Sequence, residues 1–324
     1  MLLAEVRSAV THDAYAWLLT DPETCVGSAP VADVPSLGDL PCLIRLKYLT
    51  STNRWTNLES SAVTTLATAT DGDLARSRMW SELLVTYGVE DVVSVVFRDR
   101  YGCWGFLDLW RIGGTFSSEE CAALQRTADV ITTSLRRTLA STFVHRSSDV
   151  DPAGGPAVLL LSEDIELLTQ TPQTDAYLRE LLPPETGRSP VPAAAYNVAA
   201  QLLASEQDVD SHQPWARVHL RDGLWVTLRA ARMERRSSAD GATIAVSIEP
   251  TPPLERASLY ARVVGLSERE AELLHHLVGG SDTHELAKLL FLSEHTVQDH
   301  LKSIFAKTGI NSRRKLIARA TGVA

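Results

Sequence analysis

The chain has 324 residues and a formal net charge of −9 at pH 7; 44% of its residues are hydrophobic and 22% are charged. This is the composition of an ordinary globular protein that is long enough for two or three domains. The acidic balance excludes nucleic-acid binding over the whole surface, so any contact with DNA must be confined to one part of the chain.

The sequence predicts a cytoplasmic protein without a metal or other cofactor. No charged-then-apolar signal segment opens the chain, and no uninterrupted apolar run reaches the roughly 18 residues of a membrane span. The cysteines Cys25, Cys42, Cys103 and Cys121 form no C-x-x-C pair and have no histidine cluster beside them. They are interpreted as reduced core thiols, with a thiol switch between Cys103 and Cys121 as the alternative.

The first region, residues 1–145, is predicted to be one α/β domain. The β-branched run 92–97 and the alternating segment 103–110 flank a turn and indicate a β-hairpin. Apolar residues at helical spacing predict three helices before the hairpin, over residues 2–10, 40–49 and 76–87.

A long helix is predicted to follow the hairpin. Ser117 and Glu120 have the spacing of a capping box, which marks its first turn. One stripe of this helix is apolar and suits either covering a sheet or pairing with the same helix of a second subunit; it consists of Leu124, Ala128, Ile131, Leu135 and Leu139.

A hairpin followed by a long amphipathic helix resembles a GAF-like sensor domain. The run Phe97-Arg98-Asp99 with Cys103-Trp104-Gly105 is similar to the sensor halves of actinobacterial LuxR-type regulators. Five tryptophans are concentrated in this region, which suits an apolar ligand pocket, with plain core packing as the alternative. These candidate pocket residues are Trp17, Trp55, Trp80, Trp104 and Trp110.

The second region, residues 157–250, is predicted to be a small α+β domain. Residues 149–156 before it have the composition of a linker. A strand over 157–161, an outer segment over 165–168 and two helices over 174–182 and 193–205 precede three strands. These strands, over 216–220, 224–233 and 243–248, form a meander, and the whole unit resembles a PAS-like domain.

Residues 251–264 are predicted to join this region to the C-terminus as a short helix and to serve as a hinge. The segment Glu249–Pro253 contains three prolines, which end the preceding sheet.

Residues 265–324 are predicted to form an all-α domain of four short helices. Their starts are marked by two capping boxes, Ser267 with Glu270 and Asp282 with Glu285, and by two further caps, Ser293 and Ser312. The third helix has one apolar face, formed by Val297, Leu301, Ile304 and Phe305, and one polar face. Two helices joined by a short turn, the second with a polar face, are typical of a helix-turn-helix that enters the DNA major groove.

These residues resemble the LuxR-type (GerE-like) DNA-binding domain of bacterial transcriptional regulators. The resemblance rests on Leu266-Ser267-Glu268-Arg269-Glu270, on Glu285-Leu286-Ala287 and on Thr296-Val297-Gln298-Asp299-His300-Leu301. It continues through Ile304, Lys307, Gly309 and Ser312-Arg313. The family commonly has lysine where this chain has Gln298, so the resemblance implies that the bases preferred here differ from the usual ones.

The candidate DNA-contacting residues come from this domain. From Lys302 onward every charged side chain is basic, which places this end along phosphates. Phosphate contacts are expected from Thr296, Lys307, Arg313 and Arg314, and base contacts from Gln298, Asp299, Lys302 and His295. The alternative for Asp299 is that it only balances Lys302 three residues later.

The sequence therefore predicts a multidomain DNA-binding transcriptional regulator, acting as a homodimer on double-stranded DNA, with sensor domains for a small molecule or partner. No phosphate-binding loop, nucleophile elbow or carboxylate pair indicates an enzyme, and Lys288 stands where a zinc protease would have its second histidine. An acyl-homoserine-lactone receptor, or a response-regulator-like protein without a phospho-acceptor, is the alternative.

Overall fold

The computed structural model describes residues 2–35, 37–59, 63–143, 155–181, 192–220, 223–234 and 243–323. The chain divides into two units. The first consists of Met1–Thr132, Pro152–Val218 and Thr227–Glu249, and the second of Thr133–Asp151, His219–Val226 and Pro250–Ala324. Within the described ranges, no helix is both long and apolar enough to cross a membrane.

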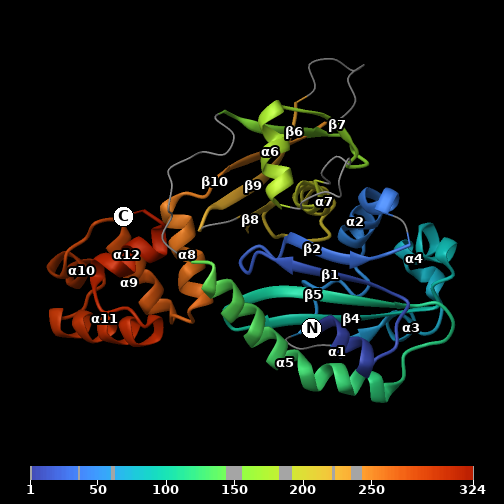
Figure 1. The fold of residues 1–324 in the computed structure, drawn as a ribbon, viewed down its shortest axis with the longest axis horizontal. Coiled ribbons are helices and arrows are strands. Elements are labelled where there is room, and N and C mark those ends of the chain that lie inside the picture. Colours follow the sequence, from blue (N-terminus) through green and yellow to red (C-terminus); the bar gives the residue numbers. More distant parts are fainter. Residues whose placement is uncertain are drawn as a thin grey trace. The chain divides into compact units, whose positions relative to one another are not determined.

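The first sheet has five strands in the order β2-β1-β5-β4-β3 (Figure 1). The predicted hairpin is confirmed as β4 and β5, whereas β1 and β2 were not predicted. Pro30 lies in β2, an edge strand, where its missing N–H is tolerated. The strands are β1 (Ala14–Thr20), β2 (Gly27–Asp33), β3 (Val63–Thr65), β4 (Asp91–Asp99) and β5 (Gly102–Arg111).

The helices predicted before the hairpin are confirmed in two of three cases. These are α1 (Leu2–Ala9) and α2 (Leu40–Leu49). The prediction of one helix over 76–87 is wrong, because Ser77 is extended and caps a new helix by accepting from the Trp80 N–H. The chain forms α3 (Leu66–Ala69), η2 (Leu74–Arg76), α4 (Arg78–Glu82) and η3 (Leu84–Tyr87) there.

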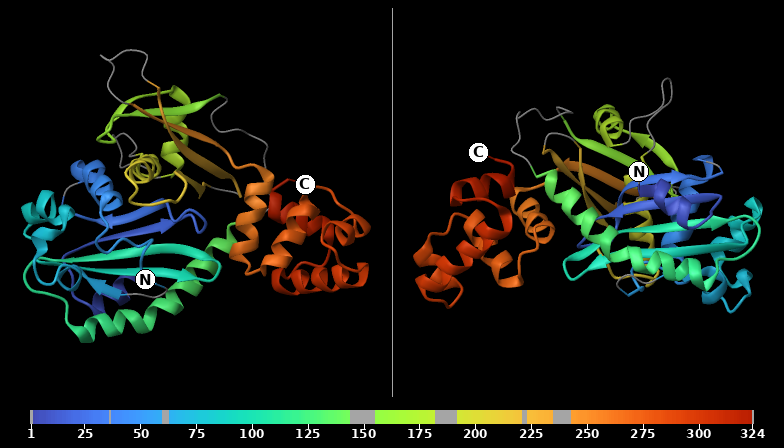
Figure 2. Two further views of the ribbon diagram at one scale, coloured as in Figure 1. Left: turned by 180° about the vertical axis from the view of Figure 1, so that it is seen from behind. Right: turned by 60° about the horizontal axis from the view of Figure 1, so that its bottom comes forward.

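In the first unit, residues 118–132 of the long helix α5 (Ser118–Ser141) run along the face of the first sheet opposite α2 and α4 (Figures 1 and 2). Its predicted capping box is present, because Ser117 N–H donates to Glu120 and Glu120 N–H donates to Ser117 Oγ. Leu124, Ala128 and Ile131 are all buried within this chain. These three residues therefore cover the chain's own sheet and cannot also form a dimer interface in this conformation, whereas Leu135 and Leu139 of the same stripe are half-buried.

The second sheet repeats the strand order of the first. Its order is β7-β6-β10-β9-β8, so each sheet, counted from its own first strand, follows the order 2-1-5-4-3. The predicted meander is confirmed, although residues 221–222 of its first turn, and 149–154 of the predicted linker, lie outside the described residues. The elements are β6 (Ala157–Leu161), β7 (Leu167–Gln170), α6 (Pro172–Leu181), α7 (Ala193–Glu206), β8 (Trp215–His219), β9 (Trp225–Arg232) and β10 (Ile244–Pro250).

A buried ion pair joins the parts of the first unit that carry the two sheets. Arg217 on β8 donates from Nε to Asp21 Oδ2 at 2.7 Å and from Nη2 to Oδ1 at 2.8 Å, and its backbone N–H donates to the same carboxylate at 3.0 Å. Asp21 follows β1 and is 1% exposed. Burial alone would raise the pKa of the Asp21 carboxyl, but the Arg217 guanidinium and the hydrogen bonds outweigh it and lower that pKa.

Arg54 makes a second connection of this kind. Its side chain is fully buried, stacks 4.7 Å from the Trp55 ring and donates to Asp210 Oδ2 at 2.8 Å and to Gln201 Oε1 at 3.0 Å. Gln201 lies on α7, which packs on α2 and β2. The two regions that the sequence separates between residues 145 and 157 therefore share one core.

The cysteine that pairs with Cys103 is not the one considered from the sequence. The Cys25 and Cys103 thiols lie close enough to shift each other's pKa, which is raised for Cys25 and lowered for Cys103, and both side chains are buried. All four cysteines are free thiols.

Among its described residues, the second unit contains the end of α5 and five further helices, one of which is the segment expected to be a joining helix. Helix α8 (Pro253–Val263) packs on α9 and α12, and Leu259, Tyr260 and Val263 are buried. The predicted caps are present at all four following helices. These are α9 (Glu268–Val278), α10 (Thr283–Leu289), α11 (Glu294–Thr308) and α12 (Arg313–Thr321).

Replacement of Arg217 by methionine is expected to destabilise the first unit by about 3–5 kcal/mol, because Asp21 is left buried without its counter-charge. Urea unfolding followed by tryptophan fluorescence measures this, since six of the seven tryptophans belong to that unit. Arg179→Met is the matched control, because Arg179 forms an exposed pair with Asp175 that contributes at most about 1 kcal/mol. Equal effects of the two variants would contradict the prediction.

Candidate functional site

Helices α10 and α11 are joined by a turn of four residues, Leu290 to Ser293, in a fixed conformation. Phe291 has φ 54° and is 95% exposed, and the Leu292 N–H donates back to Ala287 O at 2.9 Å. Ser293 then caps α11, because its side chain accepts from the Thr296 N–H. Leu286 on α10 and Val297 on α11 are fully buried, which fixes the angle between the two helices.

Helix α11 presents an exposed polar face opposite its buried one. Val297, Leu301 and Ile304 are buried, whereas the predicted base-contacting residues are exposed. The exposed set consists of Gln298, Asp299, Lys302 and His295. Such a face is the part of a helix-turn-helix that can reach base edges.

The structure places Asp299 between two of the other predicted base-contacting residues. Lys302 Nζ donates to Asp299 Oδ1 at 3.0 Å, and His295 Nε2 lies 3.5 Å from Asp299 Oδ2. The hydrogen bond from Lys302 is the main reason that the pKa of Asp299 is lowered. All three side chains are more than half exposed, so these contacts are weak and easily exchanged for others.

The predicted phosphate-contacting residues have different surroundings. Arg313 Nη2 donates to Thr283 Oγ1 at 3.1 Å, Thr296 Oγ1 lies 2.8 Å from Ser293 Oγ, and Arg314 is exposed at the start of α12. Lys307 is held differently, because its Nζ donates at 2.5 Å to the buried carboxylate of Glu270.

Thr283 is a residue of this surface that the sequence did not indicate. It is the first residue of α10, after the cap Asp282, and its Oγ1 accepts from both Arg313 and, at 3.4 Å, Gln298 Nε2. The predicted capping box places Thr283 on the first turn of α10. That α10, α11 and α12 meet at Thr283 is seen only in the structure.

Glu270 is the polar anchor beneath this surface. It completes the α9 capping box and accepts from Ser303 Oγ at 2.6 Å and from Lys307 Nζ at 2.5 Å. Burial alone would raise the pKa of the Glu270 carboxyl, but these hydrogen bonds outweigh it and lower the pKa to about 2. Glu270 therefore fastens α11 to α9 through a charged hydrogen-bond network.

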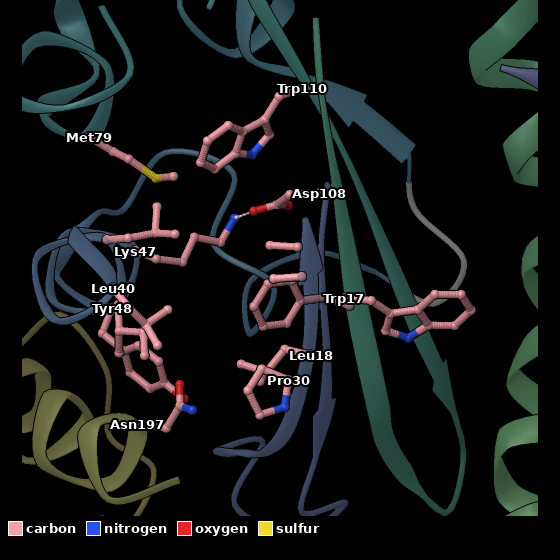
Figure 3. Close-up of a pocket in the computed structure, with 15 residues that line it drawn as sticks. Trp17, Leu18, Pro30, Leu40, Lys47, Tyr48, Met79, Asp108, Trp110 and Asn197 are labelled. Atoms are coloured by element: carbon pink, nitrogen blue, oxygen red, sulfur yellow. Dashed lines mark ion pairs between the residues drawn. The ribbon is translucent and has the colours of Figure 1, made fainter. Parts of the chain in front are cut away.

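A separate apolar pocket lies in the first unit, between the first sheet and helices α2, α4 and α7 (Figure 3). Ala16 pairs with Asp108 and Leu18 with Phe106 across β1 and β5, so these four residues share the face that lines it. The cavity volume is about 50 Å³, which is enough for a few water molecules but below the roughly 150 Å³ of a cavity that holds benzene, so a ring-sized ligand enters only if the lining side chains move.

The five candidate tryptophans do not converge on this pocket. Two of them, Trp17 and Trp110, line it, although the indole of Trp17 points to the other side of the sheet, 5.4 Å from the Phe97 ring (Figure 3). Trp55, Trp80 and Trp104 do not line it, and their indole N–H groups donate to Cys25 O, Val89 O and Asp99 Oδ1, respectively. Elsewhere in the described ranges, no three or more His, Cys, Asp or Glu side chains gather as metal ligands would.

The C-terminal helices are similar in sequence to a known protein family. Residues 264–320 match the profile of the family described as bacterial regulatory proteins, luxR family. This stretch is a luxR-family domain. It contains α9 to α12, and α8 lies outside the match.

Two curated relatives match the luxR-family domain. They are the probable csgAB operon transcriptional regulatory protein of Salmonella typhimurium and the CsgBAC operon transcriptional regulatory protein of Escherichia coli. Each is 38% identical over 55 residues, which are 17% of this chain and 26% of the relative. The match thus spans about a quarter of the length of these relatives.

Two solved structures align with larger parts of the chain. Escherichia coli SdiA aligns over 99% of this chain and 88% of its own, with 12% identity and a TM-score of 0.32. The phage VqmA–DPO complex aligns over 51% and 80%, with 18% identity and a TM-score of 0.24. Both TM-scores are too low to indicate a shared fold.

Replacement of Glu270 by glutamine is expected to loosen the luxR-family domain by about 1–3 kcal/mol, because the charge-assisted bonds to Lys307 and Ser303 weaken. The folded pKa of about 2 lies below the ordinary 4.5, so the stabilisation is complete above about pH 5 and is lost as the pH falls towards 2. Hydrogen exchange of α9 and α11 measures both effects. Glu272→Gln, which removes an exposed carboxylate of the same helix, is the control; exchange that is equally accelerated in both variants would contradict the assignment.

Proposed function

We propose that the protein is a DNA-binding transcriptional regulator in which α11 enters the major groove. The observation that carries this proposal is the exposed polar face of α11 over a buried apolar one, within a capped α10–α11 pair. The match to the luxR family and the names of the two relatives, both transcriptional regulatory proteins, support it. An enzymatic function has no comparable support.

Within this proposal, Gln298, Asp299 and Lys302 contact bases, with His295 at the edge of the groove. The Gln298 amide suits adenine, Lys302 suits guanine, and Asp299 can only accept, most naturally from cytosine. Because Asp299 and Lys302 form an exposed pair, DNA binding exchanges that pair for bonds to bases at little cost.

Phosphate contacts are proposed for Thr296, Lys307, Arg313 and Arg314. Arg314 is the best placed for a test, because it is exposed and lies at the start of α12. Lys307 has a second role in this proposal, since its ammonium also holds Glu270. Thr283 positions Gln298 and Arg313, because its hydroxyl lies between them.

The two sheets are proposed to be a sensor region, with a GAF-like domain over residues 1–145 and a PAS-like domain over 157–250. Their common strand order, and the pocket on the face of the first sheet, support this reading. We further propose that the protein binds its operator as a homodimer, because one recognition helix reads only a short half-site. Because Leu124, Ala128 and Ile131 of the α5 stripe are buried, the interface that we propose is the fourth helix of the C-terminal domain, α12.

Replacement of Arg314 by alanine is expected to weaken binding to all DNA sequences alike and to reduce the slope of log affinity against log salt by about one unit. Fluorescence anisotropy over a salt series measures this with a specific and a random duplex. Arg179→Ala removes the same charge from an exposed site of α6 and should change neither quantity. A changed sequence preference in Arg314→Ala would show that this residue reads bases.

Replacement of Gln298 by lysine is expected to raise affinity for all DNA and to move the preference from adenine to guanine at one position of each half-site. The discrimination should amount to about 1–3 kcal/mol, because a lysine donates to guanine O6 or N7. Selection from random DNA at one salt concentration measures it. A binding motif identical to that of the unchanged protein would exclude Gln298 from base contact.

A further inference from the structure

The pocket of the first unit contains two buried polar atoms that lack a partner among the described residues. These are Asn197 Oδ1 and Trp110 Nε1. Asn197 is fully buried and Trp110 is 1% exposed, so bulk water does not satisfy either group. A buried acceptor or donor without a partner costs about 1–3 kcal/mol, so such a group is expected to have a partner in the functional state.

The orientation of the Asn197 amide is set by its own helix. Its Nδ2 donates to Ala193 O at 2.9 Å, and a carbonyl oxygen can only accept. The amide nitrogen must therefore face the helix backbone, which leaves Oδ1 as an acceptor at the pocket wall. Figure 3 shows Asn197 beside Tyr48 at one end of the pocket.

The other end of the pocket is rich in donors. Figure 3 shows Trp110 beside Asp108, which forms an ion pair with Lys47 at 2.7 Å. Asp108 also accepts from Ser94 Oγ at 2.7 Å, so its charge is compensated within the protein. The Lys47 ammonium has three N–H donors and, with the indole N–H of Trp110, can donate to an acceptor in the pocket.

The remaining wall is apolar, and the charges that line the pocket sum to zero. Aliphatic and aromatic side chains from β1, β2, β5, α2 and α4 form it, among them Leu18, Pro30 and Met79. A charged ligand would bring an uncompensated charge into this buried site, which costs more than its contacts return. A neutral ligand does not meet this penalty.

We propose that this pocket binds a small, neutral, mainly apolar molecule that has a hydrogen-bond acceptor, such as a carbonyl oxygen, at one end and a hydroxyl or N–H donor at the other. The acceptor lies against Trp110 and Lys47, and the donor bonds Asn197 Oδ1. The proposal deepens the sensor role proposed above and rests on it for its biological meaning, although binding itself requires no DNA.

The position of Asn197 links this ligand to the rest of the first unit. Asn197 lies on α7, one helical turn before Gln201, which accepts from the buried Arg54. A bond from the ligand to Asn197 therefore adds to the contacts that hold α7 on β2 and α2. Ligand binding should raise the thermal stability of the first unit by mass action.

The test uses four probes with the full-length protein in mildly acidic buffer, where their phenols are neutral. 4-Hydroxyacetophenone carries both an acceptor and a donor, acetophenone only the acceptor, phenol no carbonyl, and 4-hydroxybenzoate a negative charge. Calorimetry and thermal shift at millimolar probe should rank 4-hydroxyacetophenone first and the anion last. Saturable binding by none of the neutral probes, or strongest binding by the anion, overturns the proposal.

Two variants locate the ends of the ligand. Asn197→Leu should reduce affinity for 4-hydroxyacetophenone about fivefold to tenfold, to the level of acetophenone, and leave acetophenone unchanged. Trp110→Phe should weaken binding of the two ketones, 4-hydroxyacetophenone and acetophenone, and spare phenol. Trp17→Phe is the matched control: Trp17 also lines the pocket, but its indole, whose N–H is likewise buried and unpartnered, lies on the other side of the sheet, so the change should affect no probe. Equal losses for all probes in Asn197→Leu would assign that residue a purely structural role and overturn the proposal.

A separate measurement keeps the two proposals apart. DNA affinity of the protein without any probe tests the regulator function alone. Loss of probe binding with intact DNA binding rejects only the ligand, whereas intact probe binding without DNA binding rejects only the regulator function.

Discussion

The fold of the first unit depends on opposite charges that are removed from water together. Arg217 and Asp21 stand 196 residues apart in the sequence, and each would be strongly unfavourable in the core without the other. Neither sheet can leave the other without exposing or stranding one of these charges. A second buried pair, Arg54 with Asp210, acts in the same way, and Arg54 also holds Gln201 of α7. This keeps α7 beside the first sheet, where its Asn197 lines the pocket. What looks in sequence like two successive domains therefore forms one compact unit.

In the free protein, the side chains of the surface proposed to bind DNA form hydrogen bonds and ion pairs with one another. Asp299 holds Lys302, and Thr283 holds Gln298 and Arg313. These contacts are exposed, so DNA phosphates and bases can replace them with little loss of energy. The contact of Lys307 with Glu270 is different. Glu270 is only 4% exposed, so if Lys307 moved away, the Glu270 carboxylate would be left buried without its counter-charge. The surface thus combines exchangeable polar contacts with one fixed support beneath them.

The parts of the structure that could be predicted from sequence are those with local causes. The caps at Ser267, Asp282, Ser293 and Ser312 act within three residues, and the β4–β5 hairpin closes through a short turn. By contrast, β1 was not predicted. Its side chains alternate between the two faces of the sheet in a way that can be recognised only from its pairing with β5. That register also separates Trp17 from Trp110, although both are apolar residues of the same sheet. The meeting of α10, α11 and α12 at Thr283, and the pairing of Asp21 with Arg217, depend on contacts across long stretches of chain, which no local pattern encodes.

Arg256 on α8 makes the C-terminal helices less separable than a family boundary implies. Its Nη1 donates to Arg319 O at 2.6 Å and Ala320 O at 2.8 Å, closing the last turn of α12, while its guanidinium lies 4.8 Å from the Phe143 ring. A gene fusion or a proteolytic cut at Gly265, near the start of the family match, would remove this cap and uncover the sides of α9 and α12 that α8 protects. The helices that carry the recognition surface are therefore not an interchangeable module ending where the family ends. In this chain, α8 belongs to the same packed group of helices as α9 and α12.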